Sequence, residues 1–112
     1  MGGDEQLSIV PGTLEMLVLK TLSLAPMHGW GIGERIQQMS RDAFRVNQGT
    51  LYPVLERLQQ QGWVKAEWRA SDNNRRAKYY ILTASGARRL AAEQEEWERS
   101  IRAVSLILRT VG

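Results

Sequence analysis

The chain of 112 residues contains no cysteine and a single histidine, His28. The lack of cysteine excludes disulfides, thiol chemistry and thiolate-bound metals, and one histidine excludes any site that needs two imidazoles. No apolar run approaches the ~18 residues that a membrane-spanning helix needs. The first six residues are polar and slightly acidic, unlike a secretion signal. We therefore expect a soluble cytoplasmic domain.

Catalytic groupings are missing as well. The lone histidine has no suitable partner for a Ser-His-Asp arrangement, and we expect it to lie in a loop or to cap a helix. The glutamates of residues 93–98 lie on a predicted exposed helix face. The glycines at 29, 31 and 33 follow no predicted strand, so they do not form a nucleotide-binding loop. We expect no enzymatic activity, no cofactor and no metal ion.

Positive charge is concentrated in the middle of the chain. Residues 41–89 hold ten basic and four acidic residues, whereas the rest of the chain holds five basic and eight acidic residues. Twelve of the 15 basic residues are arginine, the side chain suited to bidentate contacts with phosphate and guanine. A basic block favours nucleic acid or an anionic membrane as partner. Charge alone more often marks a solvated surface. The positions of these residues in the fold therefore have to show whether they bind an anionic partner.

Three short helices are predicted in the first half of the chain. The first ends before Pro26, the second covers about residues 30–39 after a connector at residues 27–29, and the third follows Asn47 as its N-cap. In each helix the apolar residues recur at i, i+3 and i+4. The side chains expected to face inward are Leu14, Leu17, Val18, Leu22, Ile32, Ile36, Met39, Leu51, Val54, Leu55 and Leu58.

A β-hairpin is predicted to follow the helices. Apolar and charged residues alternate from residue 64 to residue 69, which is typical of a half-buried strand, and residues 77–82 form a second β-prone run. The turn formers of residues 71–74 join the two strands. We expect Trp63 and Trp68 to lie in the core of this hairpin.

A last, long helix is predicted for about residues 84–110, capped by Thr83. Its apolar seam has the spacing of a coiled coil over three heptads. A small domain cannot cover such a stripe alone, so we expect a second chain to cover it. Packing against the first helix of the same chain is the alternative, and both can hold on different turns. The seam consists of Leu90, Gln94, Trp97, Ile101, Val104, Leu108 and Val111.

This order of elements predicts a mainly α, α+β fold: a winged helix-turn-helix domain at residues 1–83, with residues 1–10 flexible, and a dimerisation helix at residues 84–112. The third helix would fit the major groove of double-stranded DNA, and the hairpin would act as a wing that reaches the DNA backbone or the neighbouring minor groove. The expected contacts are polar side chains at the start of that helix, one arginine farther along it, and polar and basic side chains at the wing. These residues are Asn47, Gln48, Thr50, Tyr52, Arg57, Asn74, Arg75, Arg76 and Lys78.

Several motifs resemble the PadR family of bacterial transcriptional regulators, and the match as a whole covers roughly residues 7–111. The length of the chain resembles the short branch of that family, which has a single C-terminal helix. Gly29-Trp30 stands where glycine-tyrosine is more usual, and the swap keeps an amphipathic aromatic residue. The matching motifs are Pro11-Gly12-Thr13-Leu14, His28-Gly29-Trp30-Gly31-Ile32, Gln48-Gly49-Thr50-Leu51-Tyr52-Pro53-Val54-Leu55, Gln61-Gly62-Trp63-Val64 and Asn74-Arg75-Arg76-Ala77-Lys78-Tyr79-Tyr80-Ile81-Leu82-Thr83.

The resemblance implies a homodimer that binds an inverted-repeat operator and usually represses transcription. It implies release by a small aromatic or drug-like effector in some members, with Trp97 as the residue that matches a pore-lining aromatic. The DNA contacts that it implies are Gln48, Gly49, Thr50, Tyr52, Pro53, Arg75, Arg76 and Lys78.

Three alternatives stay open at this point. A winged helix can serve as a protein-interaction module, although such a module does not need the basic residues of the wing. A constitutive repressor without ligand response is the second alternative. Trp97, at a seam position, either packs in a dimer core or lines a ligand pore.

Overall fold

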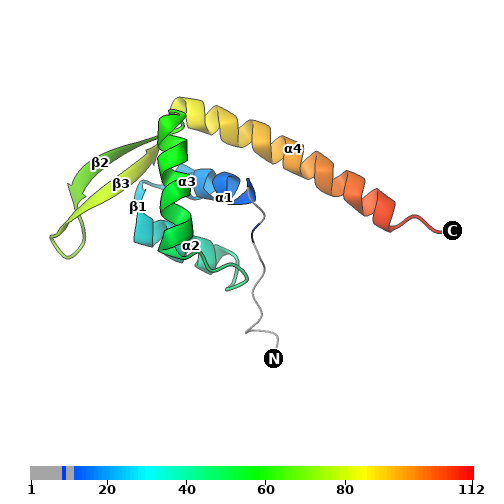
Figure 1. Cartoon of the computed structure of the whole chain (residues 1–112), viewed down its shortest axis with the longest axis horizontal. Helices are drawn as coiled ribbons and strands as arrows, with labels where there is room; N and C mark the ends of the chain where they lie inside the picture. Colours follow the sequence, from blue (N-terminus) through cyan, green and yellow to red (C-terminus); the bar gives the residue numbers. More distant parts are fainter. Residues whose placement is uncertain (1–8, 10–11) are drawn as a thin grey trace.

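The computed structural model of the protein describes residue 9 and residues 12–112. Helices dominate, and a small antiparallel sheet extends from one side (Figure 1). This mixed arrangement confirms the predicted winged-helix architecture. The elements are α1 (Thr13–Leu24), β1 (Met27–His28), α2 (Gly29–Met39), α3 (Gln48–Gln60), β2 (Val64–Ala70), β3 (Arg76–Leu82) and α4 (Ala84–Leu108).

The core lies around α1, which contacts α2, α3, α4 and β3. Nearly every side chain predicted to face inward is buried, because the i, i+3, i+4 spacing places those residues on one face of each helix. The buried polar residue Thr21 donates its hydroxyl to the carbonyl of Leu17 at 2.7 Å, so its burial leaves no hydroxyl proton unpaired. The hydrophobic core consists of Leu14, Val18, Leu19, Leu22, Ile32, Ile36, Leu51, Val54, Leu55, Leu58, Val64, Tyr80 and Leu90.

The predicted connector at residues 27–29 is instead a short strand followed directly by α2. Met27 pairs with Tyr80 and His28 pairs with Tyr79, so that β1 extends the hairpin to a three-stranded sheet of order β1-β3-β2. Two residues are too few for a periodic pattern, so the sequence alone did not predict this strand. His28 also caps α2, because its Nδ1 accepts from the backbone N–H of Gly31 at 3.0 Å. The expected capping role of His28 is confirmed.

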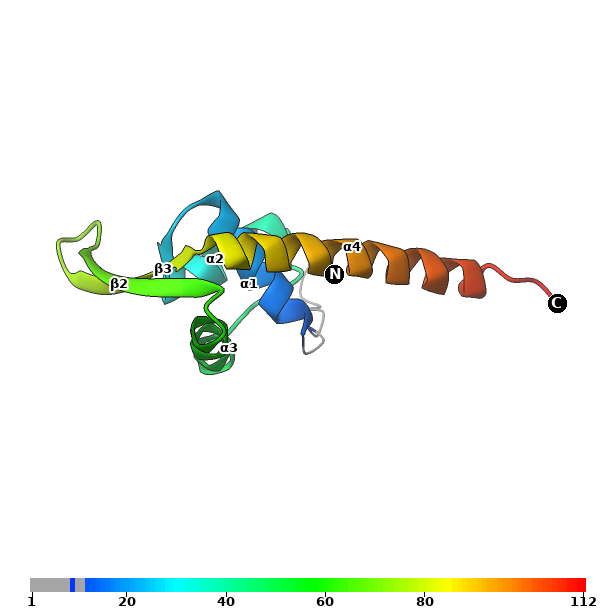
Figure 2. The ribbon, with the colours of Figure 1, turned by 90° about the horizontal axis from the view of Figure 1, so that it is seen from above.

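Two residues predicted to be buried are exposed. Trp68 was expected in the hairpin core, but β2 and β3 extend beyond the helices and leave its side chain 59% exposed (Figures 1 and 2). Met39, the last residue of α2, is 45% exposed. The prediction fails at both positions because the element continues past the body of the domain. Trp63, nearer the base of the hairpin, does pack against the core.

Helix α4 begins at a tightly packed junction with the end of α3. Thr83 accepts from the N–H of Gly86 at 3.0 Å as the predicted cap, and its hydroxyl donates to the carbonyl of Gly62 at 2.7 Å. Its backbone N–H donates to the carbonyl of Trp63 at 3.1 Å. A Cβ at position 86 would overlap that carbonyl, so the junction requires glycine there. The direction in which α4 leaves the domain is therefore set by this junction.

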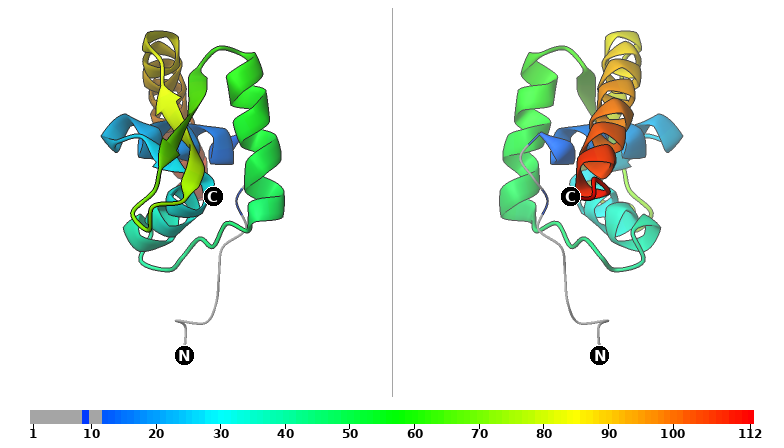
Figure 3. Two further views of the ribbon diagram at one scale, coloured as in Figure 1. Left: turned by 90° about the vertical axis from the view of Figure 1, so that its left-hand side faces the viewer. Right: turned by 90° about the vertical axis from the view of Figure 1, so that its right-hand side faces the viewer.

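Beyond its first turns, α4 projects from the domain as a free rod (Figures 1 and 2). The molecule is 61 Å long in consequence, and the other elements cluster around one end of α4 (Figures 1 and 2). Figure 3 shows the molecule from either end of this long axis. The helix ends at Leu108, two residues earlier than predicted, which leaves Val111 outside it. In the part of the chain described here, no helix combines the length and apolarity needed to span a membrane.

The prediction of a flexible segment at residues 1–10 falls almost entirely outside the described residues. Ile9 is described, and its partly buried side chain packs against the core.

Candidate nucleic-acid interface

The first turn of α3 presents polar groups to solvent. Asn47 caps the helix as predicted, with its Oδ1 accepting from the N–H of Thr50 at 2.8 Å. The opposite face of α3 is buried, so Gly49, Thr50 and Tyr52 are exposed and Gln48 is half-buried. The N-terminal end of a helix carries partial positive charge and free N–H groups, which favours a phosphate there. The cap engages the oxygen of Asn47, which leaves its amide NH₂ as the group that can meet DNA.

Pro53 lies deeper in α3 than the first turn, because it is the sixth residue of a helix that begins at Gln48. A proline at that place has no N–H to donate to the carbonyl of Gly49. Its ring is exposed on the same side as Tyr52. The helix nevertheless continues through Pro53 to Gln60.

The tip of the wing is a tight turn held by Ser71. The N–H of Ser71 donates to the carbonyl of Arg75 at 2.6 Å, and its hydroxyl lies 2.7 Å from Oδ1 of Asn73 and 2.8 Å from the same carbonyl. Asn74 has a φ of +63°, the left-handed conformation that asparagine tolerates better than most residues. Asn74 thus shapes the turn, and the turn presents Arg75 to solvent.

Three cations of the wing lie over aromatic rings of the same hairpin. The guanidinium of Arg76 lies 5.5 Å from the ring centre of Trp68, and the ammonium of Lys78 lies 5.8 Å from that of Tyr80. Arg69 stacks in the same way over Tyr79, at 5.6 Å. Such contacts stabilise a cation at an exposed site by about 0.5–1 kcal/mol and restrict its rotamers. The exposed Trp68 therefore orients Arg76, a role that its alternating pattern did not reveal.

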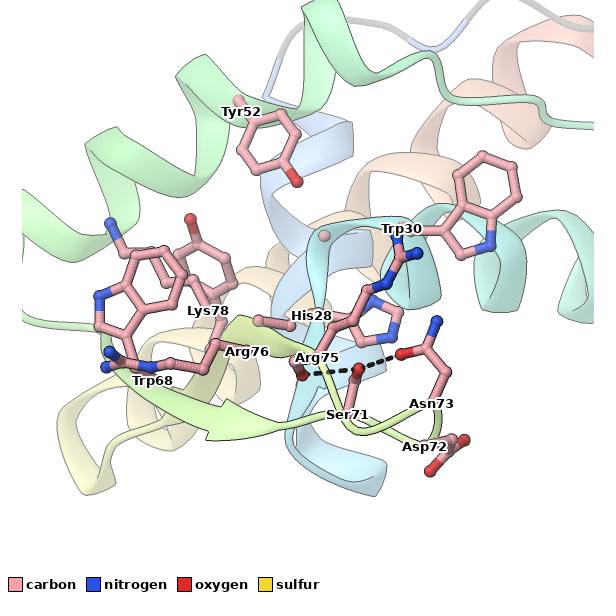
Figure 4. A pocket seen from close by; sticks show the side chains of 13 residues that line it. His28, Trp30, Tyr52, Trp68, Ser71, Asp72, Asn73, Arg75, Arg76 and Lys78 are labelled. Atoms are coloured by element: carbon pink, nitrogen blue, oxygen red, sulfur yellow. Dashed lines mark hydrogen bonds between the residues drawn. The ribbon is translucent and has the colours of Figure 1, made fainter.

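A groove of about 670 Å³ separates the wing from the helices (Figure 4). Trp68, Arg76 and Lys78 line it on the wing, Tyr52 enters it from α3, and the first turn of α2 forms its far side. Three elements that are distant in the sequence therefore meet at one surface. The full lining is His28, Gly29, Trp30, Tyr52, Trp68, Ser71, Asp72, Asn73, Arg75, Arg76, Ala77, Lys78 and Tyr80.

Tyr52 is held in this groove by close packing on α2. A Cβ at position 29 would overlap the phenol of Tyr52, so Gly29 gives the ring its place. Deeper in the groove, burial raises the pKa of the Tyr80 hydroxyl, and the neighbouring Tyr52 and Glu56 act in the same direction. The Tyr80 phenol is therefore a protonated donor near neutral pH.

Arg57 stands apart from the other predicted contacts. Its Nη2 lies 2.6 Å from Oε2 of Glu15 on α1, and its Nε donates to the same oxygen at 2.7 Å. This ion pair joins α3 to α1 across 42 residues of sequence and neutralises the charge that made Arg57 a candidate. The structure thus gives Arg57 a structural contact away from the groove.

The predicted seam of α4 divides into two parts. Leu90 is only 8% exposed and belongs to the core of its own chain, so its assignment to a dimer interface is corrected. The remaining apolar seam residues are exposed, on the projecting rod or, for Val111, just beyond its end. Leu106 and Ile107, each 71% exposed, add apolar surface outside the seam, which the heptad pattern did not reveal. The exposed seam residues are Gln94, Trp97, Ile101, Val104, Leu108 and Val111.

Trp97, 44% exposed, lies where α4 leaves α1, with a hollow on either side. One hollow of about 280 Å³ is lined by Met16, Leu17 and Leu90 among others. The second, of about 230 Å³, is lined by Met16, Glu93, Glu96 and others.

The carboxyl of Glu93 is largely buried beside Trp97. Burial raises its pKa, and Glu15 and Glu96 act in the same direction, whereas Arg89, 3.3 Å away, lowers it. Its Oε1 is buried without a hydrogen-bond partner among the described residues. No three metal-ligating side chains come together in residue 9 or residues 12–112.

Comparison with known proteins identifies the family. The sequence profile of the "Transcriptional regulator PadR-like family" matches residues 18–92, about two thirds of the chain. The transcriptional regulator Rv3488 of Mycobacterium tuberculosis is 37% identical over 68 residues, which are 61% of this chain and 63% of that protein.

Solved structures share the fold. A PadR family transcriptional regulator from Eggerthella lenta is 31% identical, with a TM-score of 0.76 over 89% of this chain and 85% of the other. The protein smu.1704 from Streptococcus mutans is 26% identical, with a TM-score of 0.81 over 95% and 97% of the two chains. Members of the family are transcriptional regulators and not enzymes. The chain therefore belongs to the PadR-like family of transcriptional regulators.

Proposed function

We propose that this regulator acts as a homodimer that binds an inverted-repeat operator in cytoplasmic DNA and represses transcription. The observation that carries the proposal is the common surface formed by Tyr52 of α3, the first turn of α2 and the cations of the wing, which continues across Trp30 to the start of α3. An exposed helix start beside a cationic hairpin matches what double-stranded DNA offers: base edges in the major groove and phosphates along its rim.

Affinity and specificity come from different parts of this surface. Arg75, Arg76 and Lys78 contact phosphates and supply most of the binding free energy, which makes binding salt-dependent. Gln48, Thr50 and Tyr52 reach base edges, with Gly49 allowing close approach of the backbone. Asn47, Pro53 and Asn74 shape the surface from its margins. Arg57 is left out because Glu15 already neutralises it.

The dimer is the second part of the proposal, with residues 84–112 as the dimerisation segment and the domain that ends at residue 83 as the DNA-binding unit. The projecting rod exposes apolar side chains of a coiled-coil seam, which a second copy of the same rod would cover. The two α3 helices would then meet successive major grooves about 34 Å apart, and the operator would share the two-fold symmetry of the protein.

An effector site beside Trp97 is the third part. The indole faces hollows at the point where the rod leaves the domain, so an aromatic compound stacked there would alter the angle of the rod. A ligand changes DNA affinity only if it binds the two arrangements unequally, and this location gives it that difference.

Replacement of Arg75 and Arg76 by alanine tests the DNA-binding surface. We expect weaker binding to every duplex and a less steep dependence of log K on log salt, by roughly one unit for each phosphate that the variant no longer neutralises. The measurement is a salt titration on DNA from upstream of the chain's own gene and on a scrambled duplex of equal length. Alanine at Arg88 and Arg102, which removes the same charge from α4, is the control. An unchanged slope in the wing variant would contradict the proposal.

Replacement of Ile101 by aspartate tests the dimer. A carboxylate at the centre of the seam would have to be buried without a partner, which costs several kcal/mol. We expect sedimentation equilibrium to give the mass of a dimer for the native chain and of a monomer for the variant, with unchanged helix content. Aspartate at Ala103, an exposed position off the seam of the same helix, should leave the dimer intact. A dimeric Ile101 variant would place the interface elsewhere.

Replacement of Trp97 by alanine tests the effector site. We expect planar aromatic dyes to bind the native chain and to bind the variant at least about tenfold more weakly, because a stacked ring is worth roughly 0.5–1.5 kcal/mol beyond its buried area. Dye fluorescence anisotropy measures both affinities. Alanine at Trp68, which is also exposed, is the control. Equal dye affinity in the native chain and the Trp97 variant, or no binding to either, would favour a repressor without ligand response.

A further inference from the structure

Trp30, in the first turn of α2, is the most exposed aromatic side chain of the molecule, at 61%. The core of the domain does not use it, because α2 buries the opposite face through Ile32 and Ile36. Four cation–aromatic contacts are found among the described residues. Trp63 and Trp68 each take part in one of them, whereas Trp30 takes part in none. The amphipathic indole of Trp30 is therefore free to contact a partner, and its surroundings have to show which kind.

Trp30 forms a ridge between two hollows. On one side lies the groove shared with the wing, where the indole stands at the opposite end from Trp68 (Figure 4). On the other side lies a hollow of about 370 Å³ between α2 and the start of α3, lined by Arg45, Asn47 and Gln48 among others. A DNA strand laid from the start of α3 to the wing would therefore pass directly over this indole.

The surroundings of Trp30 carry a net positive charge, which favours a polyanion. Arg45 and Glu34 line one hollow, whereas Arg75, Arg76 and Lys78 line the other together with Asp72, so four cations stand against two carboxylates. The N-terminal turn of α2, to which Trp30 belongs, adds its own partial positive charge. An apolar protein partner would favour an apolar rim, whereas a nucleic-acid backbone matches cations on both sides with an amphipathic ring between them.

We propose that Trp30 is a DNA-backbone contact, with the indole packed on a deoxyribose and its Nε1–H donating to a phosphate oxygen of one strand. The apolar face of a sugar and the acceptor oxygens beside it correspond to the two parts of the indole, a large ring and a single donor. The assignment rests on the proposed DNA-binding function. It adds α2 to the two elements that the sequence predicted as contacts.

The test compares Trp30→Ala and Trp30→Phe with Met39→Ala in the full-length chain. Met39 is exposed at the other end of the same helix, so its variant controls for loss of exposed apolar surface. Binding is measured on the upstream duplex and on the scrambled duplex over a range of salt concentrations. Circular dichroism melting of each variant checks the fold.

We expect Trp30→Ala to weaken binding about tenfold on both duplexes, because a sugar-phosphate contact does not depend on the sequence. The salt slope should stay the same, since no charge is removed. Trp30→Phe should fall between the native chain and the alanine variant, because it keeps the ring and loses the N–H. Met39→Ala should bind as the native chain does.

The outcomes separate this assignment from the proposed function. If the native chain binds neither duplex, the DNA-binding proposal itself fails. If the native chain binds and Trp30→Ala binds equally well, the function stands and the contact is wrong. A loss confined to the upstream duplex would make Trp30 a reader of bases, and a melting temperature lowered by several degrees would make it a structural residue. Either result would overturn the backbone assignment.

Discussion

Four apolar side chains on one face of α3 hold this helix against the core, and the geometry of the interface depends on them. Leu51, Val54, Leu55 and Leu58 are all nearly or fully buried, which leaves α3 a single orientation about its axis. Burying each such side chain contributes on the order of 1.5–3 kcal/mol. The remaining positions of the helix then face outward by the 3.6-residue repeat alone. The same packing that stabilises the domain thus determines which side chains are available to DNA.

Close contacts with glycine couple the neighbouring elements to that helix. Gly29 lets Tyr52 lie against the start of α2, and Gly86 lets the start of α4 meet the carbonyl of Trp63 just after α3 ends. The positions of the interface and of the projecting rod are therefore both fixed relative to α3. A force that tilts the rod acts on a short, closely packed junction, which is how an effector beside Trp97 could influence a surface at the other end of the domain.

Much of the fold follows from the sequence because its signals are local. Helix faces, the Asn47 and Thr83 caps and the hairpin come from spacing and from single residues with strong conformational preferences. Strand β1 was missed because two residues carry no period, and its existence depends on pairing with β3, about 50 residues away. Alternation predicted burial for Trp68, but it cannot tell where a strand leaves the body of the domain.

The candidate site was predicted less completely, for physical reasons that differ between residues. The position of Arg57 in a basic block indicated DNA, whereas its partner Glu15 lies too far along the chain to be inferred. Heptad spacing placed Leu90 in the seam. The first turns of α4, however, pack against α1, so Leu90 is buried in the core of its own chain. Trp30 had a usable signal, since it lies off the Ile32 and Ile36 face of its helix.

Amide hydrogen exchange of the full-length chain, with and without duplex DNA from upstream of its gene, tests the central claim most directly. One DNA-binding surface composed of three elements predicts that exchange slows together at residues 28–31, 48–53 and 71–78. It also predicts that the projecting turns at residues 101–108 exchange as they do without DNA. Slower exchange confined to the projecting turns, with no change in those three segments, would contradict the account.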